Sequence, residues 1–139
     1  MAVNQVLASV VVRRPIDEVW EVISDADAFQ KWCKMFHFEG GPFAEGKDLK
    51  LVLPLGFLKL RVPVTITRFE DQDELRWDAS FGGFHGSHWL RVRALNDEQT
   101  QVSHGEEYTG LRWIWPHIRH EVHQEYQKAA DDLQRFLEA

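Results

Sequence analysis

The middle of this chain alternates apolar and polar side chains with a period of two, and this pattern constrains the fold most strongly. The clearest run covers residues 58–67, where Leu, Val and Ile alternate with Lys, Arg, Pro and Thr. Weaker forms cover residues 49–53, 75–81, 86–95 and 100–110, and a Val-rich run covers residues 3–12. A strand with one apolar and one polar face is typical of an antiparallel sheet with one wet side. We therefore expect a curved, six- to seven-stranded antiparallel sheet.

Two short helices are expected between the first strand and the rest of the sheet. Pro15 suits the first turn of a helix, and apolar residues then recur at helical spacing as far as Ile23. Asp25 is a candidate cap for a second helix, whose apolar side includes Phe29 and Trp32. Pro63 cannot donate a hydrogen bond within a sheet, so its strand is expected to be an edge strand or bulged there.

The C-terminal segment changes to steps of three and four, which predicts one long helix. Its apolar stripe consists of Leu111, Trp115, Ile118, Val122, Tyr126, Ala129, Leu133 and Phe136. A helix of more than 20 residues is about 30 Å long and cannot fill the hollow of a curved sheet along its whole length. The remaining space predicts a cavity, and cavities that bind small molecules are typically about 300–1,000 Å³. The six Trp and nine Phe residues are many for 139 residues and favour a wide interior or a cavity wall.

Composition narrows the classes of function. The net charge is −6 and no cluster of Lys and Arg is present, so nucleic acid is not expected as a partner. No apolar run approaches the length of a membrane span, and the N-terminus does not resemble a signal peptide. The single cysteine, Cys33, fits a reducing compartment, so a cytoplasmic location is expected. Residues 1–139 are expected to form a single domain, and we predict no metal and no cofactor.

Three segments resemble the START and polyketide cyclase-like superfamily. The first is RPIDEVW at residues 14–20, followed by Asp25 and Trp32. The others, GSHWL at residues 86–90 and HGEEYTGL at residues 104–111, resemble the hairpin of one bacterial branch. This resemblance covers essentially the whole chain. It implies an α+β helix-grip fold, in which the sheet wraps around the C-terminal helix, and a lipid-like or aromatic ligand. Because cyclases, hydrolases, ligand carriers and hormone receptors share this fold, it does not assign a reaction.

A polar group is predicted inside the last hairpin. His88 shares the apolar face of one strand, and His104 and Glu106 share that of the next. A tight turn at residues 96–99 would place His88 near Glu106 and Leu90 near His104. Three interpretations stay open: the group satisfies its own hydrogen bonds, it orients an apolar ligand, or a histidine acts as general acid or base with Glu106 fixing its tautomer. A metal site formed by the two His and the carboxylate is a minor form of the third, catalytic interpretation.

The first functional hypothesis is therefore binding of a small hydrophobic or aromatic molecule between sheet and helix. The alternative is a cyclase, dehydratase or hydrolase that uses His88, His104 and Glu106. The residues expected to contact the ligand are Leu51, Leu60, Val62, Val64, Trp77, Phe81, His88, Leu90, His104, Glu106, Tyr108, Ile118, Val122 and Tyr126. An aromatic cluster at residues 113–115 is a further candidate, either as a cover for the cavity or as the contact of a homodimer.

Overall fold

Seven antiparallel strands and three α-helices make up the structure, a computed structural model that describes residues 4–81, 83–110 and 115–139. The order of strands in the sheet is β1-β7-β6-β5-β4-β3-β2. This arrangement confirms the predicted α+β fold and the two short helical segments after the first strand. The strands are β1 (Asn4–Val12), β2 (His37–Glu39), β3 (Asp48–Leu55), β4 (Leu58–Glu70), β5 (Glu74–Phe81), β6 (Phe84–Asn96) and β7 (Gln99–Thr109), and the helices are α1 (Ile16–Ile23), a 3₁₀ turn (Ala26–Ala28), α2 (Phe29–Trp32) and α3 (Trp115–Glu138).

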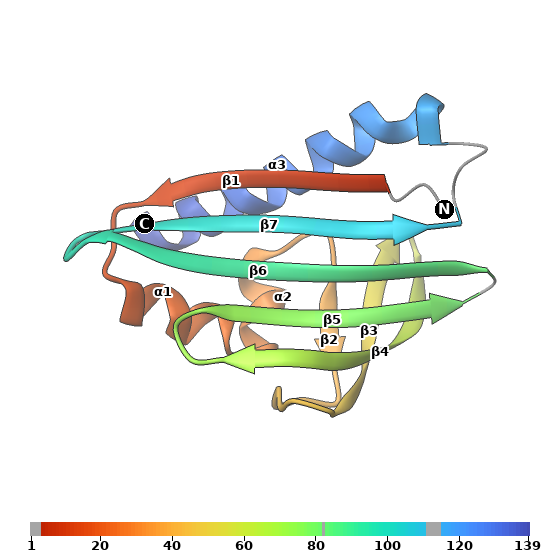
Figure 1. Cartoon of the computed structure of the whole chain (residues 1–139), viewed down its shortest axis with the longest axis horizontal. Coiled ribbons are helices and arrows are strands. Elements are labelled where there is room, and N and C mark those ends of the chain that lie inside the picture. The colour runs from red at the N-terminus through yellow and green to blue at the C-terminus, as the bar shows by residue number, and fades with distance from the viewer. Residues whose placement is uncertain (1–3, 82, 111–114) are drawn as a thin grey trace.

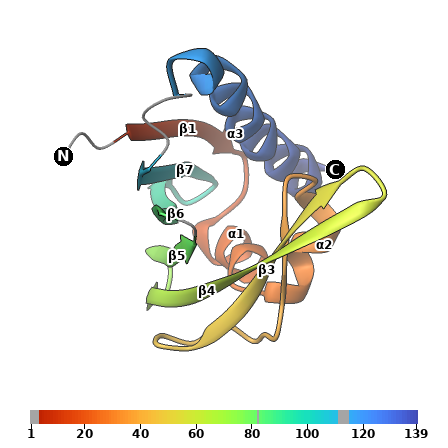
Figure 2. The same ribbon diagram turned by 90° about the vertical axis from the view of Figure 1, so that its right-hand side faces the viewer.

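The sheet curls strongly, so that β1 and β3 lie on opposite sides of a hollow (Figure 2). Helices α1 and α2 enter this hollow near the end that carries the β4–β5 and β6–β7 turns (Figure 1). Helix α3 crosses the open side along β1. Among the described residues, no short helix lies at the end that carries the β3–β4 and β5–β6 turns (Figure 1). In the described part of the chain, no helix has both the length and the apolar character needed to cross a bilayer.

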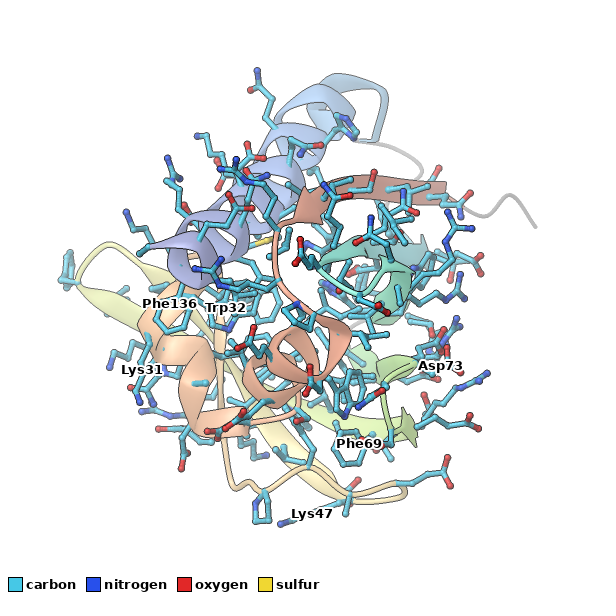
Figure 3. The ribbon with its side chains drawn as sticks, turned by 90° about the vertical axis from the view of Figure 1, so that its left-hand side faces the viewer. Lys31, Trp32, Lys47, Phe69, Asp73 and Phe136 are labelled. Atoms are coloured by element: carbon cyan, nitrogen blue, oxygen red, sulfur yellow. The ribbon has the colours of Figure 1, made fainter. Side chains whose placement is uncertain are left out.

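Aromatic rings fill the end of the hollow that α1 and α2 occupy. Phe29 of α2 lies 5.0 Å from Phe38 of β2 and 5.8 Å from Phe43, measured between ring centroids. Trp32, also on α2, is buried, whereas the adjacent Lys31 points to solvent (Figure 3). Much of the aromatic surplus in the sequence therefore forms solid core, and only part of it is available for a cavity wall.

Two details of the sheet differ from expectation. The three-residue strand β2 was not predicted, and it forms an edge of the sheet by pairing with β3. Strand β4, which carries Pro63, lies between β3 and β5, so the prediction of an edge strand is wrong, and the bulge lies between Ile66 and Arg68. The reason that Pro63 is tolerated is local: pairing with β5 begins only at Val64, so Pro63 has a partner strand on one side alone.

Helix α3 is held to the other edge of the sheet by side-chain amides. Gln127 donates a hydrogen bond to the carbonyl oxygen of Ser9 at 3.2 Å, and Gln134 donates one to that of Val11 at 2.8 Å. Strand β1 pairs only with β7, so its other edge would otherwise present free carbonyl groups. The two glutamines therefore cover this edge and fix the path of α3 across the hollow.

Candidate functional site

A cavity of about 370 Å³ lies between the sheet and α3, at the end of the hollow that α1 does not occupy. This volume falls within the usual range for sites that bind small molecules. Leu60 lines the cavity and is 40% exposed, so the cavity reaches the surface beside the β3–β4 hairpin. The lining residues are Met35, Phe36, Leu51, Leu53, Leu60, Val62, Trp77, Ala79, Phe84, Gly86, His88, Glu106, Val122 and Tyr126.

The structure brings most of the predicted ligand contacts to this cavity. Those that line it are Leu51, Leu60, Val62, Trp77, His88, Glu106, Val122 and Tyr126. The side chains of Phe81 and Ile118 lie outside the described residues, as do residues 113 and 114 and the side chain of Trp115 in the predicted aromatic cluster.

Four predicted contacts lie elsewhere in the interior. Val64 and Leu90 are buried in the main core, and Tyr108 packs in a second apolar cluster with Val6 and Ala8. His104 is 1% exposed and lies behind the cavity wall. These side chains are buried on the inward face of the sheet, but they do not line the cavity.

Several wall residues were not predicted. Met35 and Phe36 come from the connection between α2 and β2, which has no periodic pattern. Leu53 and Ala79 lie on strands that the alternation did identify, and each has the same parity as a predicted wall residue two positions earlier. The alternation was therefore a sufficient signal for Leu53 and Ala79, whereas no signal pointed to Met35 and Phe36.

The polar side of the cavity is a chain of hydrogen bonds between the last hairpin and α3. In the hairpin His88 pairs with Glu106 and Leu90 with His104, which confirms the predicted register. The Nδ1 atom of His88 lies 3.2 Å from Oε2 of Glu106, and its Nε2 atom lies 2.5 Å from Nε2 of His104. The hydroxyl of Tyr126 donates to the same Oε2 of Glu106 at 2.7 Å.

Aromatic rings hold His88 in place. Its ring stacks on Trp77, with 4.3 Å between centroids, and lies parallel to Tyr126 at 5.2 Å. The ring of Phe36 lies edge-on to His88 at 5.3 Å. Because these contacts come from β5, α3 and the loop after α2, the position of the imidazole depends on the packing of the whole cavity wall.

The protonation of His104 follows from its neighbours. Its Nδ1 atom lies 3.4 Å from the carbonyl oxygen of Tyr126, which can only accept a hydrogen bond. Burial, together with the charge of His88, holds the pKa of His104 well below its usual value, although the Tyr126 carbonyl acts in the opposite direction. His104 is therefore neutral, with its proton on Nδ1, and its Nε2 atom accepts a hydrogen bond from Nε2 of His88.

Burial raises the pKa of both acids in this chain, the carboxyl of Glu106 and the phenol of Tyr126, but their neighbours act in opposite directions. Burial alone would raise the pKa of Glu106, but the hydrogen bond and charge of His88 and the hydrogen bond from Tyr126 lower it below its usual value. Burial and the adjacent Glu106 raise the pKa of Tyr126 well above its usual value. Tyr126 therefore stays a hydrogen-bond donor to Glu106 at neutral pH.

The arrangement does not resemble a metal centre. Among the residues that the structure describes, no three His, Cys, Asp or Glu side chains are grouped as metal ligands. Both ring nitrogens of His88 are occupied, one by the hydrogen bond with His104 and the other by the ion pair with Glu106. What this chain of groups can do is accept or donate a hydrogen bond at the cavity wall, or transfer a proton there.

The comparison with protein families finds one that matches nearly the full length of the chain. The family described as "Polyketide cyclase / dehydrase and lipid transport" has a model that matches residues 4–138. A comparison with curated proteins finds no match.

Solved structures with the same fold are numerous. The Zhui aromatase/cyclase from a Streptomyces species has a TM-score of 0.80 and 14% identity, covering 99% of this chain and 94% of that one. A START superfamily protein from Mycobacterium smegmatis has a TM-score of 0.78 and 12% identity, covering 96% and 97%. Norcoclaurine synthase from Thalictrum flavum has a TM-score of 0.72 and 12% identity, covering 97% and 86%. At these identities the similarity shows a shared fold.

Proposed function

Because this chain belongs to the polyketide cyclase/dehydrase and lipid transport family, we propose that it binds a small hydrophobic or aromatic molecule in the cavity between the sheet and α3. The observation that carries the proposal is the cavity itself: among the side chains that the structure describes, its wall is apolar apart from one group on a single side, formed by His88, Glu106 and the hydroxyl of Tyr126. Apolar cavities with a few convergent polar groups are typical of binding sites for small molecules.

The volume of the cavity limits the size of the ligand. An apolar cavity of about 150 Å³ binds one benzene ring. The cavity here, of about 370 Å³, is therefore suited to a molecule of about two to three rings. The exposed position of Leu60 at its rim gives such a molecule a route from solvent.

Filling the cavity should remove binding without unfolding the protein. Ala79 lines the cavity and is only partly buried, so phenylalanine at this position would occupy ligand space. We expect Ala79→Phe to weaken the binding of two-ring aromatic probes such as naphthalene at least tenfold. A ligand that binds only the folded state raises the melting temperature, so a thermal-shift series with and without probe measures the effect.

The same substitution at an exposed site provides the control. Ala94 lies on β6 outside the cavity and is exposed, so Ala94→Phe should leave the shift caused by the probe unchanged. The proposal fails if no aromatic probe stabilises the wild type. It also fails if Ala79→Phe binds the probes as well as Ala94→Phe does.

A second candidate function, acid–base catalysis of the cyclase or dehydratase kind, is favoured by the hydrogen-bonded chain from Glu106 through His88 to His104. A carboxylate at the wall of an apolar cavity, with an imidazole bonded to it, is suited to removing a proton from carbon next to a carbonyl group. If the protein does this, it should accelerate deuterium incorporation at C1 of the two-ring ketone 2-tetralone in deuterated water. Glu106→Gln should abolish the acceleration while the ketone still binds. Equal exchange rates in buffer, wild type and variant would rule out this role.

A further inference from the structure

Glu106 has one oxygen that the hydrogen-bonded chain does not use. Both the Nδ1 atom of His88 and the hydroxyl of Tyr126 lie against Oε2. Among the described residues, no group donates a hydrogen bond to Oε1. This oxygen lies beside Gly86, where an added Cβ would be 3.1 Å away from it. Since Gly86 and Glu106 both line the cavity, Oε1 is available to a bound molecule.

The chain of hydrogen bonds fixes the charge at this wall. His88 donates from Nε2 to the neutral His104, so only its Nδ1 atom faces Glu106. A lone pair on Nδ1 and an ionised carboxylate 3.2 Å apart would repel each other, so one proton lies between them. Whichever atom carries this proton, the pair formed by His88 and Glu106 is neutral as a whole.

The rest of the wall offers nothing that would compensate a charged ligand. No Lys or Arg contributes to the cavity lining in the part of the chain that the structure describes. A carboxylate ligand would lie in an apolar cavity beside Oε1 of Glu106, without a cation to pair with, and burying an unpaired charge is strongly unfavourable. A neutral ligand that carries an O–H group avoids this cost and gives Oε1 the donor that it lacks.

We infer that the cavity selects neutral hydroxylated ring compounds, such as phenols or enols, which donate a hydrogen bond to Oε1 of Glu106, and that it rejects carboxylic acids, including fatty acids. The inference rests on the proposed function, because it specifies which molecules the cavity binds. The site recognises the ligand through one hydrogen-bond donor on an otherwise apolar molecule.

Four probes with the same two-ring skeleton test the inference by isothermal titration calorimetry at neutral pH. Naphthalene has no polar group, 2-methoxynaphthalene has only an acceptor, 2-naphthol has a donor, and 2-naphthoate is an anion. Hydrogen bonds to charged groups contribute more than neutral ones, so we expect 2-naphthol to bind about tenfold more tightly than naphthalene or 2-methoxynaphthalene. We expect 2-naphthoate to bind at least tenfold more weakly than naphthalene.

A pair of adjacent glutamates provides matched variants. Glu106→Gln keeps the shape of the side chain and one acceptor oxygen but removes the charge. The affinity of 2-naphthol should then exceed that of 2-methoxynaphthalene by about threefold or less, while naphthalene binds as before. Glu107 is exposed and lies on the other face of the same strand, so Glu107→Gln should keep the wild-type order of affinities.

The outcomes separate this inference from the proposal on which it rests. If all four probes bind with similar affinity, the cavity is a binding site but the inferred selectivity is wrong. If 2-naphthoate binds as tightly as 2-naphthol, the inference is also wrong, because an anion would then be accepted beside Glu106. If none of the probes binds, both the inference and the proposed binding function fail.

Discussion

Replacing Gly105 by alanine is expected to lower the free energy of unfolding by about 3 kcal/mol. Gly105 lies between His104 and Glu106 on β7 and pairs with Trp89 on β6, whose indole ring lies directly over it. A Cβ at this position would be 2.6 Å from Cζ2 of Trp89 and 2.9 Å from the carbonyl oxygen of Val6. Both distances are too short for a carbon contact, so the ring or the backbone must move, and overpacking of this kind costs about 1–3 kcal/mol, occasionally more.

We expect a loss of stability at the upper end of this range because the ring of Trp89 has little freedom to move. Trp89 is 2% exposed, and the guanidinium groups of Arg76 and Arg91 lie 5.0 Å and 4.9 Å from its centroid. Both arginines also bond to the buried carboxylate of Glu74. Moving the indole would therefore disturb two cation–π contacts and an ion-pair network on the outer face of the sheet.

Urea denaturation of a double-mutant cycle tests this explanation. If the clash with the indole causes the loss, Gly105→Ala should cost at least 1 kcal/mol less when Trp89 is already leucine than in the wild type. Ser103→Ala, two residues earlier on the same strand face, should change stability by no more than about 0.5 kcal/mol. A cost for Gly105→Ala that is below 1 kcal/mol, or that is the same in both backgrounds, would contradict the explanation.

The register of the last hairpin could be predicted because two independent signals agree. The polar turn at residues 96–99 fixes where the chain reverses, and the alternation of apolar residues fixes which face of each strand points inward. Together these signals are sufficient to place His88 opposite Glu106. On the earlier strands, alternation alone predicts the parity of Leu51, Val62 and Trp77.

Which of the inward-facing side chains line the cavity could not be predicted in this way. His88 and His104 share the inward face, but His88 lines the cavity whereas His104 lies behind it, against the backbone of Tyr126. The difference arises from where α3 crosses the sheet, and the periodicity of the helix does not specify that position. Val64 and Leu90 were assigned to the cavity for the same reason, because alternation gives the direction of a side chain and not what covers it.

The hydrogen-bond partners of Glu106 illustrate a second limit. Tyr126 was predicted as a ligand contact from the apolar stripe of α3, but its hydroxyl donates to Glu106, which lies 20 residues earlier in the chain. Such a contact forms only if α3 is placed against β7 with an error smaller than one helical turn. Spacing along the sequence therefore placed Tyr126 and Glu106 on inward faces, but it did not predict the hydrogen bond between them.

Acidification is expected to destabilise the protein already between pH 6.5 and 4.5, and His104 is the cause. Burial, more than the nearby charge of His88, keeps the pKa of His104 well below its usual value, so the folded protein holds this residue neutral. In the unfolded chain the residue takes up a proton below about pH 6.5. The unfolded state then binds more protons, so stability rises with pH in this window and falls as the pH is lowered.

A proton bound only by the unfolded state changes the free energy of unfolding by about 1 kcal/mol per pH unit, so stability is expected to fall by about that amount for each pH unit below 6.5 over which folded His104 stays neutral. Glu106 contributes in a different window: its pKa is lower in the folded state than its usual value of 4.5, so its stabilising effect is lost only as the pH falls below about 4.5. Urea midpoints at half-unit intervals between pH 7.5 and 4.5 therefore report mainly on His104.

Two substitutions to glutamine identify the residue responsible. His104→Gln removes the titrating group from the interior, so the pH dependence of the free energy of unfolding below pH 6.5 should become flatter by about 1 kcal/mol per unit, even if the variant is less stable at pH 7.5. His123→Gln changes an exposed histidine of α3 and should keep the wild-type slope. A wild type whose stability is constant over this window, or a slope that persists in His104→Gln, would show that His104 is not held neutral. The assignment of its proton to Nδ1, and with it the neutrality of the wall formed by His88 and Glu106, would then be wrong.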